Sequence, residues 1–368
     1  MKIVFSSNIS WSIYNFRLKL LKSLQEEGHD IYTVAFKDEY SAKLVNEGFN
    51  FNPIKLNNNA TNPLEDLKTI YTYYTIYKQI NPDVICHNAI KPNIYGTIAA
   101  GMLNIPVVNN ISGLGTLFIR KSFSTRIAKL LYKLSQKKAS KIFFQNHDDL
   151  NLFVQNKLID KSRAQVIPGS GVDTSRFIPN ADSNEDSHFQ FLFIGRLLYD
   201  KGIREYIEAI KLLKDKYPNV IFNVLGPLYV NNATAISKET LDSWIQDNLI
   251  IYLGQTDVVE KVMGMADCVV LPSYREGMSK VLIEASSMGL PIVTTNVPGC
   301  RDVVINNETG FLCEVKDSKD LADKMEKVLL MSKAKRKEMG WEARKRALEV
   351  FDEKIIINHY KQAISSVT

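Results

Sequence analysis

The sequence predicts an α/β protein made of two doubly wound units, each a parallel sheet with helices on both faces. Strand-like and helix-like segments alternate along nearly the whole chain, which is typical of parallel sheets. Residues 189–194 form a near-continuous apolar run, as a strand covered on both faces requires. The chain has 368 residues, which is enough for two domains with a hydrophobic core each.

The first half alternates between the two kinds of segment in short steps. Gly28 ends the first expected helix, and Pro63 suits the first turn of the next long helix, with Asn62 before it as the cap. The expected strands are residues 2–6, 30–36, 83–87, 107–111, 141–145 and 164–167, and the expected helices are residues 13–27, 63–80 and 94–103.

A polar stretch at residues 180–187 predicts the break between two domains, residues 1–175 and residues 188–351. Strand–helix order resumes after it, with the strand at residues 189–194 and a helix to about Lys214. Later come a strand at residues 267–273, a loop and helix to about Met288, and a strand at residues 291–295. Residues 352–368 have the apolar spacing of an amphipathic helix.

The composition is that of an ordinary globular protein, with 45% hydrophobic and 23% charged residues. No stretch approaches 18 apolar residues and the N-terminus lacks the apolar core of a signal peptide, so we expect no spanning helix and a cytoplasmic protein. The net charge of +6 is modest and no recognition motif is present, so nucleic acid is not an expected partner. The cysteines lack a Cys-x-x-Cys pair, which indicates free thiols and no structural zinc; they are Cys86, Cys268, Cys300 and Cys313.

The most informative segment is the loop and helix after residues 267–273. Glu276 lies in the loop and Glu284 in the helix, about 12 Å apart if both were helical. Between them the amides of Gly277, Met278 and Ser279 are expected at the helix N-terminus, which favours a phosphate. A nucleotide-diphosphate sugar spans this distance, with its ribose on Glu284 and its sugar on Glu276. The alternative is a pair of solvated glutamates, but the apolar neighbours of Glu284 argue against a solvent-facing position.

A second segment adds positive charge at the end of another strand. The run at residues 189–194 ends in Gly195, which allows a sharp turn, and Arg196 and Lys201 follow. Open α/β sheets bind ligands at the carboxyl ends of their strands. A guanidinium and an ammonium there suit a diphosphate whose charge grows as its bond to a sugar breaks.

Together these motifs resemble the retaining glycosyltransferases of the GT4 group, which have the GT-B fold. Gly254, in a Gly-Gln-Thr-Asp segment, and the hinge-like residues 168–173 extend the resemblance. It implies two doubly wound, Rossmann-like domains facing across a cleft, with helix 352–368 packed back on the first. In the first half, Ser12, Lys91 and Gly113 lie in segments most similar to bacterial enzymes that extend polyprenol-diphosphate-linked sugars.

The resemblance also implies a reaction. The donor would be a UDP-N-acetylhexosamine or UDP-hexose, and the acceptor a lipid-linked saccharide at the inner face of the cytoplasmic membrane. Arg196 and Lys201 would neutralise the leaving diphosphate in place of a metal, because no Asp-x-Asp motif accompanies them, so no cofactor is expected. Two other functions stay open: a UDP-sugar epimerase of the same fold, and a non-catalytic sugar-binding protein.

The acceptor side is less specific in sequence. Residues 118–141 contain no acidic residue and eight basic ones: Arg120, Lys121, Arg126, Lys129, Lys133, Lys137, Lys138 and Lys141. Several recur at helical spacing opposite an apolar set, Ile127, Leu130, Leu131 and Leu134. One interpretation is a helix docked on an anionic membrane surface, and the other is a solvated basic face over a core-packed helix. Trp11, Phe118 and Phe123 could add interfacial contacts.

His87 ends an expected strand and would face the cleft, where it could orient the acceptor or contact the donor sugar. A single histidine is as often structural, so both roles stay open. Relatives carry a histidine after the strand at residues 107–111, where this chain has Asn109, Asn110 and Ser112. The loop after the first strand, residues 8–12, lacks the usual glycine pair but could present amides to the diphosphate.

Overall fold

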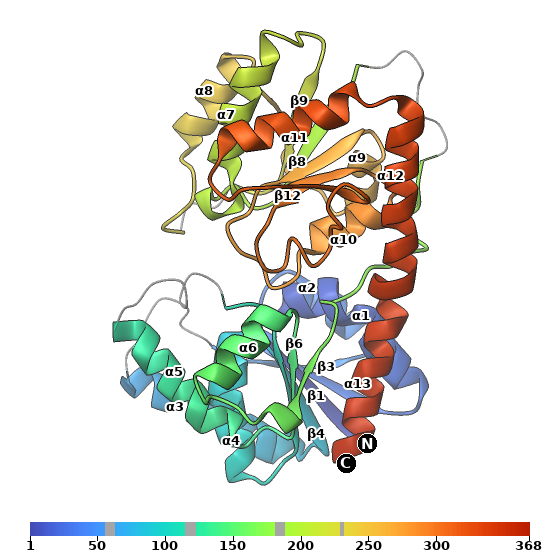
Figure 1. The fold of residues 1–368 in the computed structure, drawn as a ribbon. Helices are drawn as coiled ribbons and strands as arrows, with labels where there is room; N and C mark the ends of the chain where they lie inside the picture. The colour runs from blue at the N-terminus through green and yellow to red at the C-terminus, as the bar shows by residue number, and fades with distance from the viewer. Residues whose placement is uncertain (56–62, 115–122, 181–187, 229–231) are drawn as a thin grey trace. The chain divides into compact units, whose positions relative to one another are not determined.

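The computed structural model describes residues 1–55, 63–114, 123–180, 188–228 and 232–368. It divides the chain into two compact units (Figure 1). Unit 1 contains Met1–Ser170 and Lys354–Thr368, and unit 2 contains Gly171–Glu353. Each unit is built around its own parallel sheet, as the alternation of segments predicts.

Unit 1 has a seven-stranded sheet in the order β3-β2-β1-β4-β5-β6-β7. Its strands are β1 (Lys2–Ile9), β2 (Asp30–Phe36), β3 (Asn50–Pro53), β4 (Val84–Asn88), β5 (Val107–Ile111), β6 (Lys141–Phe144) and β7 (Ala164–Val166). Its helices are α1 (Ser10–Glu26), α2 (Tyr40–Asn46), α3 (Pro63–Ile80), α4 (Thr97–Met102), α5 (Phe123–Gln136), α6 (His147–Gln155) and α13 (Glu353–Val367), with wider or tighter turns η1 (Pro92–Gly96) and η3 (Lys161–Arg163). Within the described part of unit 1, the sequence analysis missed the short elements α2, β3, α6 and η3.

The core of unit 1 lies on both faces of this sheet, because successive side chains of a strand point to opposite faces. Ile3 and Phe5 of β1 belong to one cluster and Val4 to the other. Helix α13 covers the first face with Ile356, Tyr360, Ala363 and Ile364. The C-terminal helix therefore packs on the first unit, at the place that the resemblance implies.

Unit 2 has a six-stranded sheet in the order β10-β9-β8-β11-β12-β13. Its strands are β8 (Gln190–Ile194), β9 (Ile221–Leu225), β10 (Ile251–Tyr252), β11 (Cys268–Leu271), β12 (Ile292–Thr295) and β13 (Gly310–Cys313). Its helices are α7 (Ile203–Lys214), α8 (Lys238–Gln246), α9 (Val259–Met263), α10 (Lys280–Ser287), α11 (Ser318–Leu330) and α12 (Lys333–Arg346), with short turns η4 (Tyr199–Lys201) and η5 (Ala347–Phe351). The strand order reverses between β8 and β11, so a ligand site is expected at the carboxyl ends of these two strands.

The break between the units falls at Ser170/Gly171, ahead of the polar stretch 180–187, of which residues 181–187 lie outside the described residues. The residues after Gly171 belong to unit 2 because they bond to its far end. The Val172 amide donates to the Phe351 carbonyl at 2.8 Å. The Arg344 guanidinium donates to the carbonyls of Thr174 and Phe177, and the Phe177 ring is part of the unit 2 core. Polarity alone therefore placed the boundary about ten residues too late.

Within the described ranges, no helix combines the length and the apolar character needed to cross a membrane.

Candidate active site

Two loops meet at the carboxyl ends of β8 and β11. At Gly202, where φ is +75°, an added Cβ would lie 2.0 Å from the Pro272 carbonyl oxygen, so only glycine permits this approach. Beside it the Tyr274 amide donates to the Asp200 carbonyl at 2.9 Å. The two segments singled out in the sequence, 75 residues apart, are therefore in backbone contact.

This contact joins the side chains of the two segments. The Lys201 ammonium donates to Oε1 of Glu276, and the Ser273 hydroxyl donates to the same oxygen at 2.7 Å. Both partners of the ion pair are mostly covered, with about one fifth of the Lys201 side chain and one eighth of the Glu276 side chain exposed. The predicted cation and the predicted sugar-binding carboxylate thus form an ion pair with each other.

A second pair, which the sequence analysis missed, fixes the same loop. The Tyr274 hydroxyl donates to Oε1 of Glu205 at 2.7 Å, and Glu205 lies in the first turn of α7 with 6% of its surface exposed. Burial, followed by the bond to Glu205, raises the pKa of Tyr274, so the hydroxyl keeps its proton. The pair joins α7, which follows Lys201, to the residue two before Glu276. Its only sequence signal is an acidic residue on the otherwise apolar face of α7.

Glu284 is buried, as its apolar neighbours predict. Only 7% of its surface is exposed, and Lys280, one helical turn before it, brings its ammonium to 3.7 Å from Oε1. Burial raises the pKa of Glu284, while Lys280 and Arg176 oppose the rise. Arg176 itself is bonded to Glu260 and to the Asp257 carbonyl, both at 2.7 Å. A carboxylate held inside a polar cluster in this way is suited to bind hydroxyl groups.

The helix N-terminus differs from the prediction. Helix α10 begins at Lys280 with Ser279 as its N-cap, so Gly277 and Met278 lie in the loop before the helix. The Ser279 amide donates to the Gly299 carbonyl at 3.0 Å, and the Glu276 amide donates to Pro298 at 3.1 Å. A turn after β12 therefore occupies the Ser279 amide that was expected to face a phosphate. The Pro298–Gly299 dipeptide was the available sequence signal for this turn.

Arg196 and three glycines, Gly195, Gly226 and Gly254, lie after the strands β8, β9 and β10 of unit 2. Arg196 is exposed just after β8. Position 195 would tolerate a side chain, since an added Cβ there would make ordinary contacts of 3.7 Å or more. The close approach is at Gly226, where an added Cβ would lie 1.9 Å from the Gly195 carbonyl oxygen. The Gly226 amide also donates to the Gly254 carbonyl at 2.7 Å, so Gly195, Gly226 and Gly254 end three neighbouring strands together.

In unit 1, no loop separates β1 from α1. Strand β1 ends at Ile9 and α1 begins at Ser10, and the Trp11 amide donates to Asp38 Oδ2 at 2.9 Å. Residues 10–12 thus form the first turn of α1 and not a loop, and the Trp11 amide is bonded within unit 1. The Ser12 hydroxyl is bonded to Ser7 Oγ at 2.6 Å and to the Ile9 carbonyl at 2.8 Å.

Two other predicted residues of unit 1 lie near strand ends. Lys91 is partly buried before η1, and burial lowers its pKa despite the nearby Asp66. Gly113 follows β5 with φ of 124°. Beyond it, residues 115–122, including Phe118, Arg120 and Lys121, lie outside the described residues.

His87 is fully buried and does not face a cleft, which corrects the expectation of a ligand-facing histidine. One ring nitrogen pairs with the Tyr77 hydroxyl at 2.8 Å and the other with Asn109 Oδ1 at 2.9 Å. Burial lowers the pKa of His87 to about 4, so the ring is neutral at pH 7. Both partners come from other elements, α3 and β5. His87 is therefore a structural residue of the unit 1 core.

The basic helix α5 packs on the core of unit 1, but mostly through other residues than those the core-packed alternative names. Its buried residues are Thr125, Ala128, Tyr132, Ser135 and Gln136, and Leu131 is partly buried against the core. Leu130 and Leu134, expected to pack inward in that alternative, are 57% and 54% exposed. Arg126, Lys133 and Lys137 are exposed beside them, whereas the Lys129 ammonium donates to Asn156 at 2.8 Å. The helix thus presents leucines and cations together to its surroundings.

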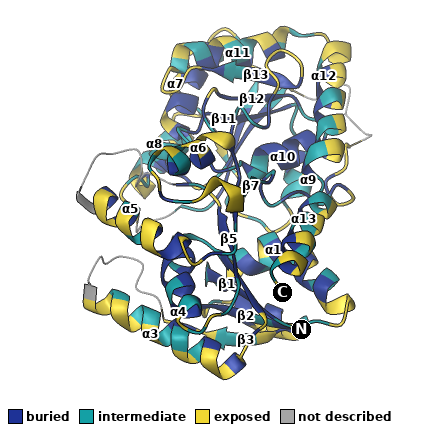
Figure 2. Ribbon diagram, turned by 60° about the horizontal axis from the view of Figure 1, so that its bottom comes forward, coloured by how far each residue is buried: buried dark blue, intermediate teal, exposed yellow. Residues whose placement is uncertain are grey.

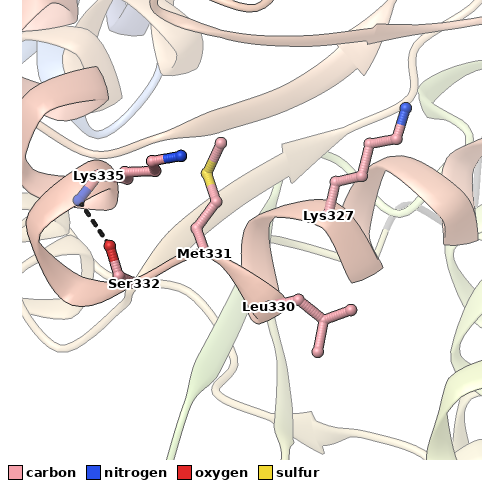
Figure 3. Close-up of a pocket in the computed structure, with 5 residues that line it drawn as sticks. All are labelled: Lys327, Leu330, Met331, Ser332 and Lys335. Atoms are coloured by element: carbon pink, nitrogen blue, oxygen red, sulfur yellow. Dashed lines mark hydrogen bonds between the residues drawn. The ribbon is translucent and has the colours of Figure 1, made fainter.

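Other potential sites are less suited to chemistry. A cavity of about 390 Å³ lies where α11 meets α12, and it contains none of the predicted site residues (Figure 3). Its lining is Lys327, Leu330, Met331, Ser332 and Lys335. Among the residues that the structure places, no group of three or more His, Cys, Asp or Glu could hold a metal ion. The four cysteines are buried free thiols, as predicted, and burial raises the pKa of each.

Comparisons with known proteins agree with this architecture. Residues 175–346 match the family model "Glycosyl transferases group 1", and residues 2–146 match "Glycosyl transferase 4-like". The chain is 29% identical to the N,N'-diacetylbacillosaminyl-diphospho-undecaprenol α-1,3-N-acetylgalactosaminyltransferase of Campylobacter jejuni, covering 98% of this chain and 97% of that protein. It is 27% identical to the Escherichia coli UDP-Gal:α-D-GlcNAc-diphosphoundecaprenol α-1,3-galactosyltransferase, covering 69% and 68%.

Among solved structures, Anabaena HepE in complex with UDP and glucose has the same fold. Its TM-score is 0.83 at 20% identity, over the whole of both chains. The sucrose-phosphate synthase of Thermosynechococcus elongatus gives a TM-score of 0.82 at 18% identity. The fold is GT-B, as the resemblance implies.

The buried His87 should make the fold sensitive to acid. The pKa of His87 in the folded chain is about 4, below the ordinary 6.5. Between these two pH values the unfolded chain therefore binds a proton at His87 that the folded chain does not bind. The resulting stability is complete above about pH 6.5 and is lost as pH falls towards 4, by about 3 kcal/mol in full. Urea unfolding of wild type and His87→Gln between pH 7.5 and 4 measures this loss. His87→Gln should show a shallower acid slope, and exposed His147→Gln should keep the wild-type slope; equal slopes for all three would contradict the assignment.

Proposed function

The chain belongs to the glycosyltransferases, and from that premise we propose that it transfers a sugar from a UDP-sugar to a saccharide carried on a polyprenol diphosphate. The observation that carries the donor half of the proposal is the Lys201–Glu276 pair at the carboxyl ends of β8 and β11. The acceptor half is supported by the Campylobacter and Escherichia relatives, whose names specify undecaprenol-diphosphate-linked sugars.

The donor is assigned from the charges of unit 2. The diphosphate binds Lys201 and Arg196, the ribose hydroxyls bind the buried carboxylate of Glu284, and the sugar hydroxyls bind Glu276. We assign UDP as the nucleotide because the name of the Escherichia relative specifies UDP-Gal. We assign an N-acetylhexosamine or a hexose as the sugar because the two relatives are named as N-acetylgalactosaminyl- and galactosyltransferases. The structure of HepE, which has the same fold, is a complex with UDP and glucose, which supports a UDP-sugar as donor.

The reaction we propose retains the anomeric configuration and needs no metal. The bond between the anomeric carbon and the UDP oxygen breaks, and the acceptor hydroxyl oxygen forms a bond to the same face of that carbon. The leaving β-phosphate oxygen takes the hydroxyl proton, since no side chain is assigned as a base. Lys201 and Arg196 stabilise the negative charge that develops on the diphosphate, which is the role a divalent ion would otherwise have.

The acceptor lies on a membrane, and we propose that unit 1 binds the membrane surface through α5. Exposed Leu130 and Leu134 can enter the interface, and Arg126, Lys133 and Lys137 can contact anionic headgroups at about 1 kcal/mol each. Helix α3, on the same side of unit 1, adds exposed Leu64, Leu67 and Tyr71 (Figure 2). The protein would thus be peripheral on the cytoplasmic face.

The reaction itself is tested by Lys201→Ala. Loss of one preorganised cation should lower turnover by about 10²-fold or more, because it stabilises the leaving diphosphate. Transfer from UDP-N-acetylhexosamines and UDP-hexoses to a polyprenol-diphosphate-linked saccharide is measured, with EDTA present to test metal independence. The exposed Lys211→Ala, on the far end of α7, serves as control. Near-normal turnover of Lys201→Ala would remove the donor assignment, and conversion of the UDP-sugar without acceptor would indicate an epimerase.

The two glutamates should separate into two roles. Glu284→Gln should weaken UDP binding by about 10-fold, the scale of a lost hydrogen bond to a charged group. Glu276→Gln frees Lys201 from its partner, so UDP should bind at least as tightly, while transfer falls because the sugar loses its carboxylate. Calorimetry with UDP and an initial-rate assay give the two values. Similar losses of UDP affinity in both variants would contradict the division of roles.

The membrane contact should depend on the exposed cations of α5 and on Lys137, which directly follows it. Changing Arg126, Lys133 and Lys137 to glutamate should release the protein from anionic vesicles and slow transfer to the lipid-linked acceptor, while transfer to a short soluble analogue stays near normal. Wild-type binding should weaken with salt. A matched control changes Lys333, Lys337 and Lys345 of α12, also exposed, to glutamate. If the two triple variants sediment alike with vesicles, α5 has no special role at the membrane.

A further inference from the structure

Unit 1 contains a buried cation without a countercharge. Only 5% of Arg17, on α1, is exposed. Its guanidinium donates to the Phe16 carbonyl at 2.9 Å and, through Nε and Nη2, to Oδ1 of Asn88 at 3.4 and 3.2 Å. None of the described carboxylates lies within ion-pair distance of it. A buried charge is costly unless something of opposite charge accompanies it.

Hydrogen-bond donors are in excess around the same point. Besides the two donors of Arg17, Asn88 Oδ1 receives the Asn110 amide at 3.2 Å and the Tyr360 hydroxyl at 3.4 Å. An amide oxygen has two lone pairs, and all four distances exceed the usual value of about 2.9 Å. Exchanging the oxygen and nitrogen of Asn88 would point its own N–H groups at these donors, so no flip relieves the excess. The neutral Asn88 Oδ1 thus lies at a point where several hydrogen-bond donors converge, and such a point favours a negatively charged oxygen.

The surrounding amides are incompletely bonded. Seven buried side-chain atoms of the described residues lack a partner, and four of them belong to Asn8, Asn88, Asn93 and Asn110. Such atoms are rare in folded proteins and indicate water or a ligand. They lie together: Asn8, Asn88 and Asn110 are at the carboxyl ends of the adjacent strands β1, β4 and β5, and Asn93 donates to the Asn110 carbonyl at 2.8 Å.

We propose that Arg17, Asn88 and Asn110, with Asn8 and Asn93 beside them, form a binding site for a phosphate group attached to a sugar. The phosphate oxygens accept from the Arg17 guanidinium and the Asn88 amide, and the sugar hydroxyls donate to the open amide oxygens. The strand order of unit 1 reverses between β1 and β4, so the site is at the position where such sheets bind ligands. The identity of the ligand rests on the proposed function: the phosphate and sugar bound here belong to the diphosphate-linked saccharide of the acceptor.

The sharpest variant is Asn88→Asp, because it supplies internally the negative charge that the ligand would bring. We expect an unchanged or higher melting temperature, since Arg17 gains a carboxylate partner. The KM for the lipid-diphosphate acceptor should rise at least 10-fold, with the KM for the UDP-sugar unchanged. Exposed Asn50→Asp on β3 adds the same charge to the same unit and should leave both KM values at wild type. Equal acceptor KM values for Asn88→Asp and Asn50→Asp would overturn the inference.

A second measurement does not require transfer. With UDP saturating the donor site of unit 2, inorganic pyrophosphate should raise the melting temperature of wild type and of Asn50→Asp, but not of Asn88→Asp or Arg17→Gln. If this pattern is found and no transfer occurs, the phosphate site stands and the proposed reaction fails. If transfer occurs normally in Asn88→Asp and pyrophosphate protects no protein, the cluster holds only water and the site inference is wrong.

Discussion

The donor site depends on the approach of two backbone segments at Gly202 and Pro272. A side chain at Gly202 would collide with the Pro272 carbonyl, so the two loops could not stay in contact. Lys201 directly precedes that glycine, and Glu276 lies four residues after that proline. The ion pair between them, the Tyr274–Asp200 backbone bond and the Tyr274–Glu205 bond all require the same approach. A substitution at Gly202 would therefore damage the charge arrangement without altering any charged residue.

The pairing of Lys201 with Glu276 also balances a partly shielded charge. A cation meant for a diphosphate must be partly shielded from water to act strongly, yet an unpaired shielded charge destabilises the fold. Glu276 gives Lys201 this partner, and the Ser273 hydroxyl donates to the same carboxylate oxygen. In the proposed reaction the nucleotide diphosphate competes with this carboxylate for Lys201, and the released carboxylate binds hydroxyl groups next to the reacting carbon.

The sequence predicted the features that depend on local pattern. The apolar runs of β8 and β11, the charged residues at their carboxyl ends and the burial of Glu284 among apolar neighbours were all accessible in this way. What could not be predicted were partners that come from distant elements. Tyr77 of α3 and Asn109 of β5 enclose His87, and Gly299 occupies the Ser279 amide. Periodicity also cannot tell which apolar residues of a helix face the core: in α5 the buried face is built on Tyr132 and small or polar residues, which leaves two leucines outside.

The two units differ in the partners of their buried or partly buried cations, and this difference affects how strongly each unit can bind an anion. In unit 2 three cations near the donor site have carboxylate partners: Lys201 with Glu276, Arg176 with Glu260, and Lys280 with Glu284. In unit 1 Arg17 donates to the Asn88 amide oxygen and the Phe16 carbonyl instead of a carboxylate. A neutralised cation binds an anion only by displacing its partner, which moderates affinity and lets the product leave. An uncompensated cation has no partner to displace, so an anion gains the full interaction. This asymmetry suits the proposed transferase, in which the nucleotide diphosphate must depart after each turnover while the acceptor diphosphate is held in unit 1.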